Sequence, residues 1–501
     1  MTTTLRGAPT AGRHPDVERG RTLAARPELA LVLVGVACLV AQLVLVPRPF
    51  GLSTDEATYL AKADPSAPEL WWSAPRAWGV PVLAAPMAAF SPGIDVVRAY
   101  FAVLSSGGLV TAFWPWLRVL RPGVAPLAAL LFGTTWFTQL FGSQVMPNLF
   151  VGLAAVGTVG AFVRAVQAPS WPRTVAAASV VALLALLRPV DSVLVVAPVL
   201  AIALLVPRLR RLTVLGALVT GGVLGWLPWI AEAFVRFGDP WSRLTAAEQD
   251  GPKGLDPDLE LMAVLPRLLD GIPAYYTRDL GMDAGPIPAV LTAWLITGLV
   301  LVPAGLVAAR VQRRSAELAV AVVPADVLAA FYLLLPAFTA LRFLLPVVAL
   351  LALTVGVALV HAVEAVSGRA RAVAAALVAV GVVGHVAIGV VKAGNSLEDH
   401  AAGRTIDLDA AAAVRPLVER EQCLLVGQRP QVIAFYVGCA VQGVGPEPRP
   451  PAAVDAALGR GWDVLAVMDA PPPPGSYLAS WHREELPGLP RRIRVLLPPE
   501  E

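Results

Sequence analysis

The chain has 501 residues, of which 56% are hydrophobic and only 15% are charged, and its mean hydropathy is +0.67. Soluble globular domains carry roughly 25% charged residues, so this composition excludes an ordinary soluble protein and predicts a polytopic protein of the lipid bilayer. The net charge is only +3, and the basic residues are spread over short loops. A nucleic-acid-binding protein would gather them on one face, so no nucleic-acid partner is expected.

The first 46 residues predict a tail followed by a membrane span. Residues 1–27 carry five arginines and little hydrophobic pattern, which predicts a disordered cytoplasmic tail. The apolar run from Leu29 to Val46 is long enough to cross a hydrocarbon core about 30 Å thick. A cleaved signal peptide is the alternative, but the long tail and the lack of a small-x-small site favour an uncleaved helix.

Ten further apolar segments follow, so we expect an all-α membrane domain over 28–392 with about eleven spans. The shortest spans are separated only by Arg188-Pro189-Val190-Asp191. The ten segments are 97–117, 123–140, 148–166, 174–187, 190–206, 212–234, 287–309, 316–335, 342–361 and 371–392.

Short arginine clusters follow alternate spans, and with eleven spans every cluster lies on the same face as the N-terminal tail. The positive-inside rule makes that face cytoplasmic and places the C-terminus outside. The clusters are Arg118 and Arg121, Arg164 and Arg173, Arg208 to Arg211, Arg310 to Arg314, and Arg369 and Arg371.

Three long segments are then expected outside the plasma membrane. The first, 48–96, contains the stretch 79–90, which is too short to span and is expected to lie along the interface. The second is 235–286. The third, 393–501, is predicted to form a small soluble α/β domain with buried strands near 423–426 and 463–467, and with helices near 408–420, 429–436 and 451–459.

The cysteines support this orientation. Cys423 and Cys439 lie in the third outer segment, at a spacing that fits a disulfide if the segment is outside the cytoplasm. Two unpaired buried thiols are the alternative. Cys38 lies inside the first span, as an ordinary small apolar residue does.

The first outer segment opens with Asp55-Glu56-Ala57-Thr58-Tyr59, directly after the first span. Charged groups at a bilayer edge are costly to desolvate and tend to be functional where they persist. The pair therefore indicates an enzyme that works at the outer face. The alternative is a helix N-cap after Ser53-Thr54, and the two roles are compatible.

At this point the layout resembles the glycosyltransferase-C superfamily, and within it the bacterial relatives of protein O-mannosyltransferases and of the aminoarabinose transferase that acts on lipid A. The resemblance rests on the D-E-x-x-Y pattern that begins at Asp55, the large first loop, and the soluble domain after the last span. It also rests on Arg342-Phe343-Leu344-Leu345-Pro346, which looks like the Arg-Tyr-x-x-Pro entry of a late span. It covers about residues 28–392. One position departs from the pattern: Asn148 stands where many relatives carry a second acidic residue.

The resemblance implies an integral-membrane glycosyltransferase. Its donor would be a polyprenyl-phosphate sugar (mannose-like, or another hexose or pentose), and its acceptor would be a hydroxyl of a glycan, lipid or protein. Asp55 is the expected general base because a hydroxyl is a poor nucleophile, and Glu56 is the second catalytic candidate. No cofactor follows with certainty. A divalent metal remains a candidate, although Asn148 puts a metal role at that position in doubt because an amide supplies no charge.

The leaving phosphate needs cations, and the planar fork of arginine suits it. Arg342 and Arg188 are the expected phosphate ligands because both lie at the outer ends of spans. Interfacial snorkelling and, for Arg188, pairing with Asp191 are the alternatives. The remaining candidate substrate-binding residues are Tyr59, Asn148, Asp191 and Tyr275.

Two other classes of function stay open. A transporter or flippase of a lipid-linked saccharide would show internal repeats and mid-membrane ionisable residues, whereas here the ionisable residues gather at the outer edge. A non-catalytic membrane scaffold is the third hypothesis, and Asn148 favours it slightly.

Overall fold

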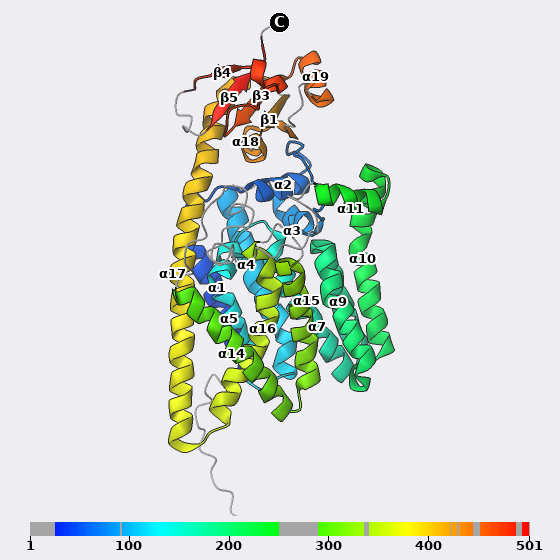
Figure 1. Cartoon of the computed structure of the whole chain (residues 1–501), viewed down its shortest axis with the longest axis vertical. Coiled ribbons are helices and arrows are strands. Elements are labelled where there is room, and N and C mark those ends of the chain that lie inside the picture. The colour runs from blue at the N-terminus through cyan, green and yellow to red at the C-terminus, as the bar shows by residue number, and fades with distance from the viewer. Residues whose placement is uncertain are drawn as a thin grey trace, which may run out of the picture.

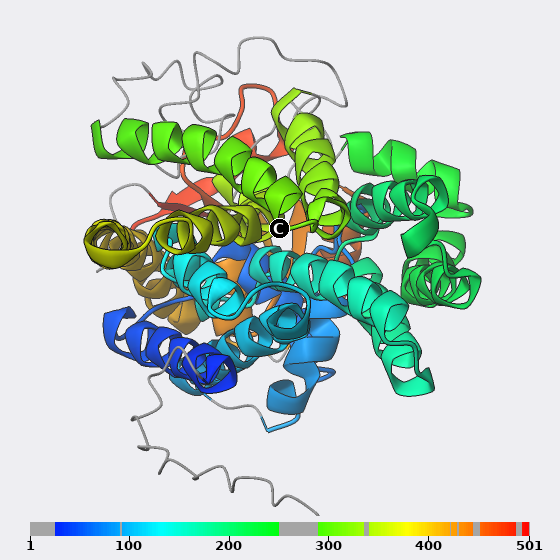
Figure 2. The ribbon, with the colours of Figure 1, turned by 90° about the horizontal axis from the view of Figure 1, so that it is seen from below.

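The computed structural model describes residues 26–90, 93–249, 289–334, 340–420, 422–427, 430–443, 451–486 and 493–499. Long helices run side by side along the longest axis, and a small β-sheet lies at one end of the bundle (Figure 1). Seen from below, the helices pack side by side in a bundle, and the sheet lies behind them (Figure 2). The prediction of an all-α polytopic membrane protein with a small α/β domain is confirmed.

All eleven segments predicted as spans are helical in their described parts. Within those parts, eight helices are long and apolar enough to cross a bilayer, or nine if the bent pair α5–α6 is counted as one span. Helices α8 and α9 have 17 residues each, about 26 Å at 1.5 Å per residue. The helices are α1 (Pro27–Leu45), α4 (Ile94–Phe113), α5 (Val124–Gly133), α6 (Trp136–Gly142), α7 (Pro147–Gln167), α8 (Trp171–Leu187), α9 (Pro189–Leu205), α10 (Leu212–Phe237), α14 (Ala289–Val311), α15 (Ser315–Leu334), α16 (Leu345–Glu364) and α17 (Gly368–Val414).

One predicted span is not straight. The segment 123–140 is broken into α5 and α6, which meet at 74°. At the break, the hydroxyl groups of Thr134 and Thr135 donate to the carbonyls of Leu130 and Phe132. Helix α17 packs directly on the break, because a Cβ atom added to Gly389 would lie 1.9 Å from the Thr134 carbonyl oxygen. The bend therefore leaves room for α17.

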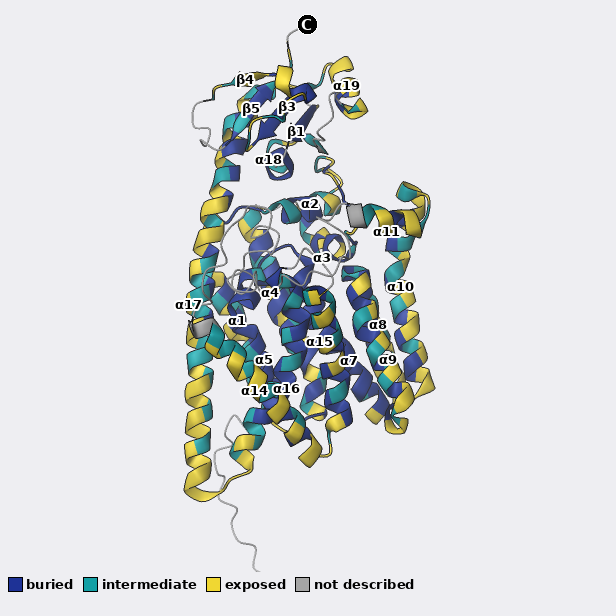
Figure 3. Cartoon of the chain, viewed as in Figure 1, coloured by how far each residue is buried: buried dark blue, intermediate teal, exposed yellow. Residues whose placement is uncertain are grey.

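Helix α7 lies at the centre of the bundle and α17 at its periphery. In the apolar 18-residue stretch of α7, 94% of the residues are buried inside the protein, whereas in that of α17 only 6% are buried. The exposed apolar length of α17 is visible along one side of the bundle (Figure 3). Since apolar residues are stable against lipid as well as against protein, this surface is the one expected to face the bilayer.

Helices α8 and α10 approach each other closely through small residues. A Cβ atom added to Gly221 would lie 2.2 Å from the Ala178 carbonyl oxygen, and one added to Gly225 would lie 2.3 Å from the Ala182 carbonyl oxygen. Such contacts between backbones are the usual basis of helix association in lipid.

The basic clusters gather at the end of the bundle opposite the sheet. There Arg118 at the end of η2 (Trp114–Arg118) pairs with Glu28 at the start of α1, at 2.9 Å. Arg208 in the turn before α10 pairs with Glu317 of α15, at 3.3 Å. The arginine-rich turns thus form one face of the protein, as the sequence predicts.

The α/β domain is joined to the bundle by α17. The sequence predicts a last span at 371–392 and a separate helix at 408–420, whereas α17 runs without a break from Gly368 to Val414. The predicted boundary at residue 392 thus falls inside one helix. Its upper part reaches the sheet (Figure 1).

The sheet has five strands in the order β2-β1-β3-β5-β4. Strand β1 is parallel to its two neighbours, β2 and β3, while β5 is antiparallel to both β3 and β4. Cys423 and Cys439 form a disulfide that joins β1 to the residue before β2. The two predicted strands correspond to β1 and β3; the others have three or four residues and no long apolar run. The elements are β1 (Cys423–Gly427), α18 (Pro430–Val437), β2 (Ala440–Gly443), α19 (Ala452–Gly459), β3 (Asp463–Met468), β4 (His482–Glu484) and β5 (Arg494–Leu497).

Candidate active site

The acidic pair lies in the first turn of α2 (Thr54–Ala63), between the bundle and the α/β domain (Figure 1). Ser53 is the N-cap: its hydroxyl accepts from the Glu56 backbone N–H, and the Glu56 carboxylate accepts from the Ser53 N–H at 3.0 Å. This capping box confirms the N-cap interpretation for Glu56. Consecutive helical residues point about 100° apart, so Asp55 and Glu56 face different surroundings.

Asp55 faces a partly open region between two cations. One carboxylate oxygen lies 2.8 Å from the Arg76 guanidinium and the other 3.7 Å from that of Arg342. The Asp55 side chain is 35% exposed, which leaves the carboxylate accessible to a bound molecule. Arg342 lies in η4 (Leu341–Leu344), the short turn that precedes α16.

The segment that carries Arg76 is held by a buried arginine. Arg243 of α11 (Pro240–Gln249) is completely buried and donates to the carbonyls of Ala74 at 3.0 Å and Arg76 at 2.9 Å. It also pairs with Glu232 at 2.9 Å. The position of Arg76 beside Asp55 is therefore fixed by contacts from the second outer segment.

Tyr59 lies on the same face of α2 as Asp55, one turn further on. The Arg76 guanidinium lies 5.2 Å from the centre of its ring. Burial raises the pKa of the Tyr59 hydroxyl, while the charges of Arg76, Arg188 and Arg342 oppose the rise. The tyrosine thus shares one electrostatic environment with these arginines and with Asp55.

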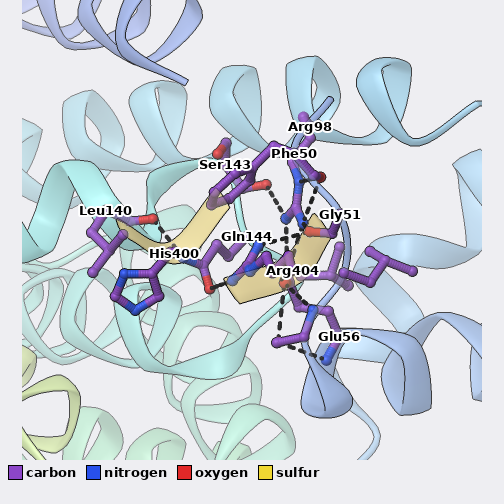
Figure 4. Close-up of polar contacts among 12 residues, drawn as sticks. Phe50, Gly51, Glu56, Arg98, Leu140, Ser143, Gln144, His400 and Arg404 are labelled. Carbon is purple, nitrogen blue, oxygen red and sulfur yellow. Dashed lines mark hydrogen bonds and ion pairs between the residues drawn. The ribbon is translucent and has the colours of Figure 1, made fainter. Parts of the chain in front are cut away.

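Glu56 lies on a different face of α2 from Asp55 and is completely buried. Its carboxylate pairs with Arg98 of α4 and, at 3.1 Å, with Arg404 of α17 (Figure 4). It also accepts from the Val145 backbone N–H at 2.9 Å. Burial alone would raise the pKa of Glu56, but the two arginine charges and the hydrogen bonds outweigh burial and lower it from 4.5 to about 2. Glu56 is therefore the charged centre of an ionic cluster at neutral pH.

Arg188 lies between α8 and α9, with its guanidinium 4.5 Å from the centre of the Phe343 ring, next to Arg342. It contacts Asp191 at 3.5 Å, and Asp191 also accepts a hydrogen bond from the Tyr332 hydroxyl. Asp191 is completely buried. The ion pair between Arg188 and Asp191, which was the alternative interpretation of Arg188, is thus present. Arg188 also remains beside Phe343, the residue next to Arg342.

Asn148 is buried in the first turn of α7, and neither polar atom of its amide has a hydrogen-bond partner within the described part of the chain. One turn later, Gly152 faces the backbone of Leu345, since an added Cβ would lie 3.2 Å from the Leu345 carbonyl carbon. Asn148 is four residues before Gly152 and therefore lies on the face of α7 that packs against the start of α16. Tyr275, also predicted to bind substrate, lies outside the described residues.

The donor set around Asp55 does not fit a divalent cation. Two guanidinium groups flank the carboxylate, and among the described residues no group of three His, Cys, Asp or Glu side chains could hold a metal ion. A carboxylate already flanked by two positive charges is a poor ligand for a further cation.

Three arginines of the site were not predicted. Arg98 starts a predicted span and is 4% exposed, so the rarity of buried charge in spans was an available signal. Arg76 follows Trp71-Trp72 in the first loop, without a recognisable motif. Arg404 falls in the predicted soluble domain, and no local pattern links it to a glutamate near the first span.

Comparison with solved structures covers nearly the whole chain. The crystal structure of ArnT from Cupriavidus metallidurans bound to undecaprenyl phosphate matches with a TM-score of 0.60 at 15% identity, over 93% of this chain and 97% of that one. The oligosaccharyltransferase of Archaeoglobus fulgidus in the apo form matches with a TM-score of 0.52 at 13% identity, over 89% of this chain and 70% of that one. This chain has the glycosyltransferase-C fold. The resemblance suggested by the sequence is thereby confirmed for the fold.

The glycosyltransferase-C fold is established here by structure rather than by sequence. No protein-family model and no curated protein matches the sequence. A further match, with a TM-score of 0.51 over 88% of this chain, is archaeal AglB in complex with an inhibitory peptide and a dolichol-phosphate. Two of these solved structures thus contain a polyprenyl-type phosphate.

Proposed function

We propose that this protein is an integral-membrane glycosyltransferase that moves a sugar from a polyprenyl-phosphate donor to an acceptor hydroxyl. The observation that carries the proposal is the partly exposed Asp55 carboxylate between Arg76 and Arg342. A carboxylate and two guanidinium groups are what a displacement of phosphate by a hydroxyl requires at one place. Support also comes from the fold, and from undecaprenyl phosphate and dolichol-phosphate in matching structures.

The site is proposed to work at the outer face of the plasma membrane, with the C-terminal domain on the same side. The arginine-rich turns lie at the opposite end of the bundle, where Arg118 and Arg208 pair with acidic residues. The positive-inside rule assigns that end to the cytoplasm. A disulfide between Cys423 and Cys439 is consistent with an oxidising compartment at the other end.

In the proposed reaction, the acceptor oxygen forms a bond to the anomeric carbon while the bond from that carbon to the phosphate oxygen breaks. The acceptor proton passes to the Asp55 carboxylate, and the bonding electrons leave with the polyprenyl phosphate. Asp55 can accept this proton because its carboxylate is accessible and is held by neighbouring groups. The donor and the acceptor are the two reactants, and the step balances without a third.

Arg342 and Arg76 would bind the donor phosphate, and Arg188 would add a third positive charge beside Arg342. The ion pair between Arg342 and Asp55 is long, at 3.7 Å, so the guanidinium can turn to a phosphate without losing a strong contact. Transfer of the arginines to the phosphate would release Asp55 to act as a base. Binding of the donor would thus prepare the base.

The other candidates take supporting parts in this proposal. Tyr59 lies beside Asp55 and would line the sugar site, and the unpaired amide of Asn148 would bind a sugar hydroxyl or a phosphate oxygen. Asp191 is buried and orients Arg188. Glu56 is enclosed by protein groups and is not placed among the groups that touch substrate.

The experiment is a transfer assay in membranes that contain the protein, supplied with labelled polyprenyl-phosphate mannose and then with other polyprenyl-phosphate hexoses and pentoses. Transfer of label to glycan, lipid or protein supports the proposal and names the sugar. Absence of transfer from every donor, together with donor movement across the bilayer, would favour a flippase. Absence of both would favour a scaffold.

A further inference from the structure

The cluster around Glu56 connects the α2 helix to a distant part of the chain. Arg404, near the upper end of α17, is 6% exposed. It donates to the Gly51 carbonyl at 2.9 Å and to the Gln144 side chain at 3.1 Å, and it pairs with Glu56 at 3.1 Å (Figure 4). Its guanidinium also lies 4.1 Å from the centre of the Phe50 ring. A single side chain thus holds the segment that leads into α2.

The segment before α2 contacts α17 closely at a glycine. A Cβ atom added to Gly51 would lie 3.2 Å from the Arg404 Cβ and 3.4 Å from its carbonyl oxygen. The segment before α2 therefore packs directly on the backbone of α17.

The α/β domain adds two attachments to the first outer segment. The Leu52 backbone N–H donates to the Tyr436 hydroxyl at 2.9 Å, and the Val441 N–H donates to the Glu69 carbonyl at 3.0 Å. Tyr436 lies on α18, which follows β1 within the loop closed by the disulfide. One attachment lies shortly before α2, and the other lies beyond it at Glu69, so the domain holds the chain on both sides of this helix.

The bundle holds Glu56 from the opposite side. Arg98 of α4 pairs with Glu56 and donates to the Gly51 carbonyl at 2.7 Å, and the Val145 N–H donates to the same carboxylate at 2.9 Å. Glu56 is therefore the shared anion between the bundle and α17. Asp55 is the next residue along the chain, so any rotation of α2 that breaks this cluster also moves Asp55.

We infer that α17 and the α/β domain position the base of the proposed glycosyltransferase, through Arg404 and Tyr436 acting on the segment 50–56. Glu56, Arg404 and Tyr436 are positioning residues and do not touch substrate. Removal of one partner from a buried ion pair leaves an uncompensated buried charge, and small displacements of reacting groups have large effects on rate. The inference rests on the proposed function, although the positioning itself can be measured without activity.

The first test is hydrogen exchange, followed by mass spectrometry, over residues 50–60 of the full-length protein. Tyr436→Phe removes one hydroxyl and keeps the ring, so the Leu52 amide should exchange about fivefold faster, the equivalent of one net hydrogen bond. Arg404→Met should raise exchange over the whole segment by more than about tenfold. Thr405→Ala is the matched control, because that hydroxyl is exposed and, among the described residues, donates to the Ala401 carbonyl of its own helix.

The second test measures kcat and donor KM for the same variants. Arg404→Met and Tyr436→Phe should lower kcat while donor KM changes less than about twofold, since the phosphate-binding arginines are retained. Exchange that is unchanged in both variants would overturn the inference, whether or not the wild type transfers sugar. Faster exchange with unchanged kcat would also overturn it. A wild type that transfers no sugar rejects the proposed function, and the exchange result still decides whether the domain holds the segment.

Discussion

Asp55 and Glu56 are adjacent in the chain, yet their carboxylates lie in opposite environments. The Asp55 side chain is 35% exposed and pairs with Arg76, whereas the Glu56 side chain is fully buried between Arg98 and Arg404. The first turn of α2 separates them by about 100°. This geometry divides the acidic pair into an accessible group, suited to take a proton, and an enclosed group, suited to fix the helix.

Replacement of Arg342 tests the phosphate site. Arg342→Gln should reduce transfer about 10- to 100-fold, because a hydrogen bond to a charged group contributes about 1.5–3 kcal/mol. Most of the loss should be a rise in donor KM. Arg342→Lys should recover part of it, since lysine keeps the charge but not the fork. The control is Arg371→Gln, which changes an exposed arginine in the first turn of α17. An equal effect in both variants would contradict the assignment.

Glu56 should make stability depend on pH in the acid range. The pKa of Glu56 is about 2 in the folded protein, whereas an unperturbed glutamate, as in the unfolded chain, has a pKa of 4.5. The unfolded chain therefore binds the proton more tightly. The stabilisation, on the order of 3 kcal/mol, is complete above about pH 4.5 and is lost as pH falls toward 2.

The check is the unfolding temperature of purified protein between pH 6 and pH 3. The wild type should lose stability across this range, and Glu56→Gln should be less stable at pH 6 with a flatter dependence. Glu69→Gln changes an exposed glutamate of the same outer segment and should keep the wild-type slope. If Glu56→Gln also kept that slope, another group would be responsible.

Helix packing offers a test independent of function. Gly221→Ala should destabilise the contact between α8 and α10 by about 1–3 kcal/mol, because the new methyl group would meet the Ala178 carbonyl at 2.2 Å. Gly216→Ala lies on the same helix with nothing within 4 Å of the added atom. It should be neutral or slightly stabilising, since alanine favours the helix. Thermal unfolding in detergent distinguishes the two variants, and equal unfolding temperatures would show that the close contact is absent.

Local composition was sufficient to predict most of the fold. Apolar length located the helices of the bundle, and the buried runs at 423–426 and 463–467 located β1 and β3, because burial on both faces leaves a continuous apolar pattern. The bend between α5 and α6 could not be predicted in this way. At the bend, Thr134 meets Gly389 of α17, a helix far along the chain, and the local sequence does not show this contact.

The candidate site was predictable only in part, for the same physical reason. Asp55 was recognisable because charged groups at a bilayer edge are costly to desolvate, and the acidic pair directly follows the first span. The different surroundings of Asp55 and Glu56 depend on which arginines lie beside each carboxylate. One of these arginines, Arg404, contacts Gly51 in the first outer segment although the two residues are 353 positions apart in the chain. No periodicity or spacing encodes a contact of that kind.

The most direct test of Asp55 as the base compares initial rates of sugar transfer by wild type, Asp55→Asn and Asp64→Asn at saturating donor. Asp64 caps the C-terminal end of the same helix, and asparagine can keep its local turn. We predict a loss of at least about 100-fold for Asp55→Asn, the contribution expected of a general base, with wild-type rates for Asp64→Asn and equal amounts of folded protein in the membrane. Transfer by Asp55→Asn at the wild-type rate would contradict the assignment of Asp55 as the base.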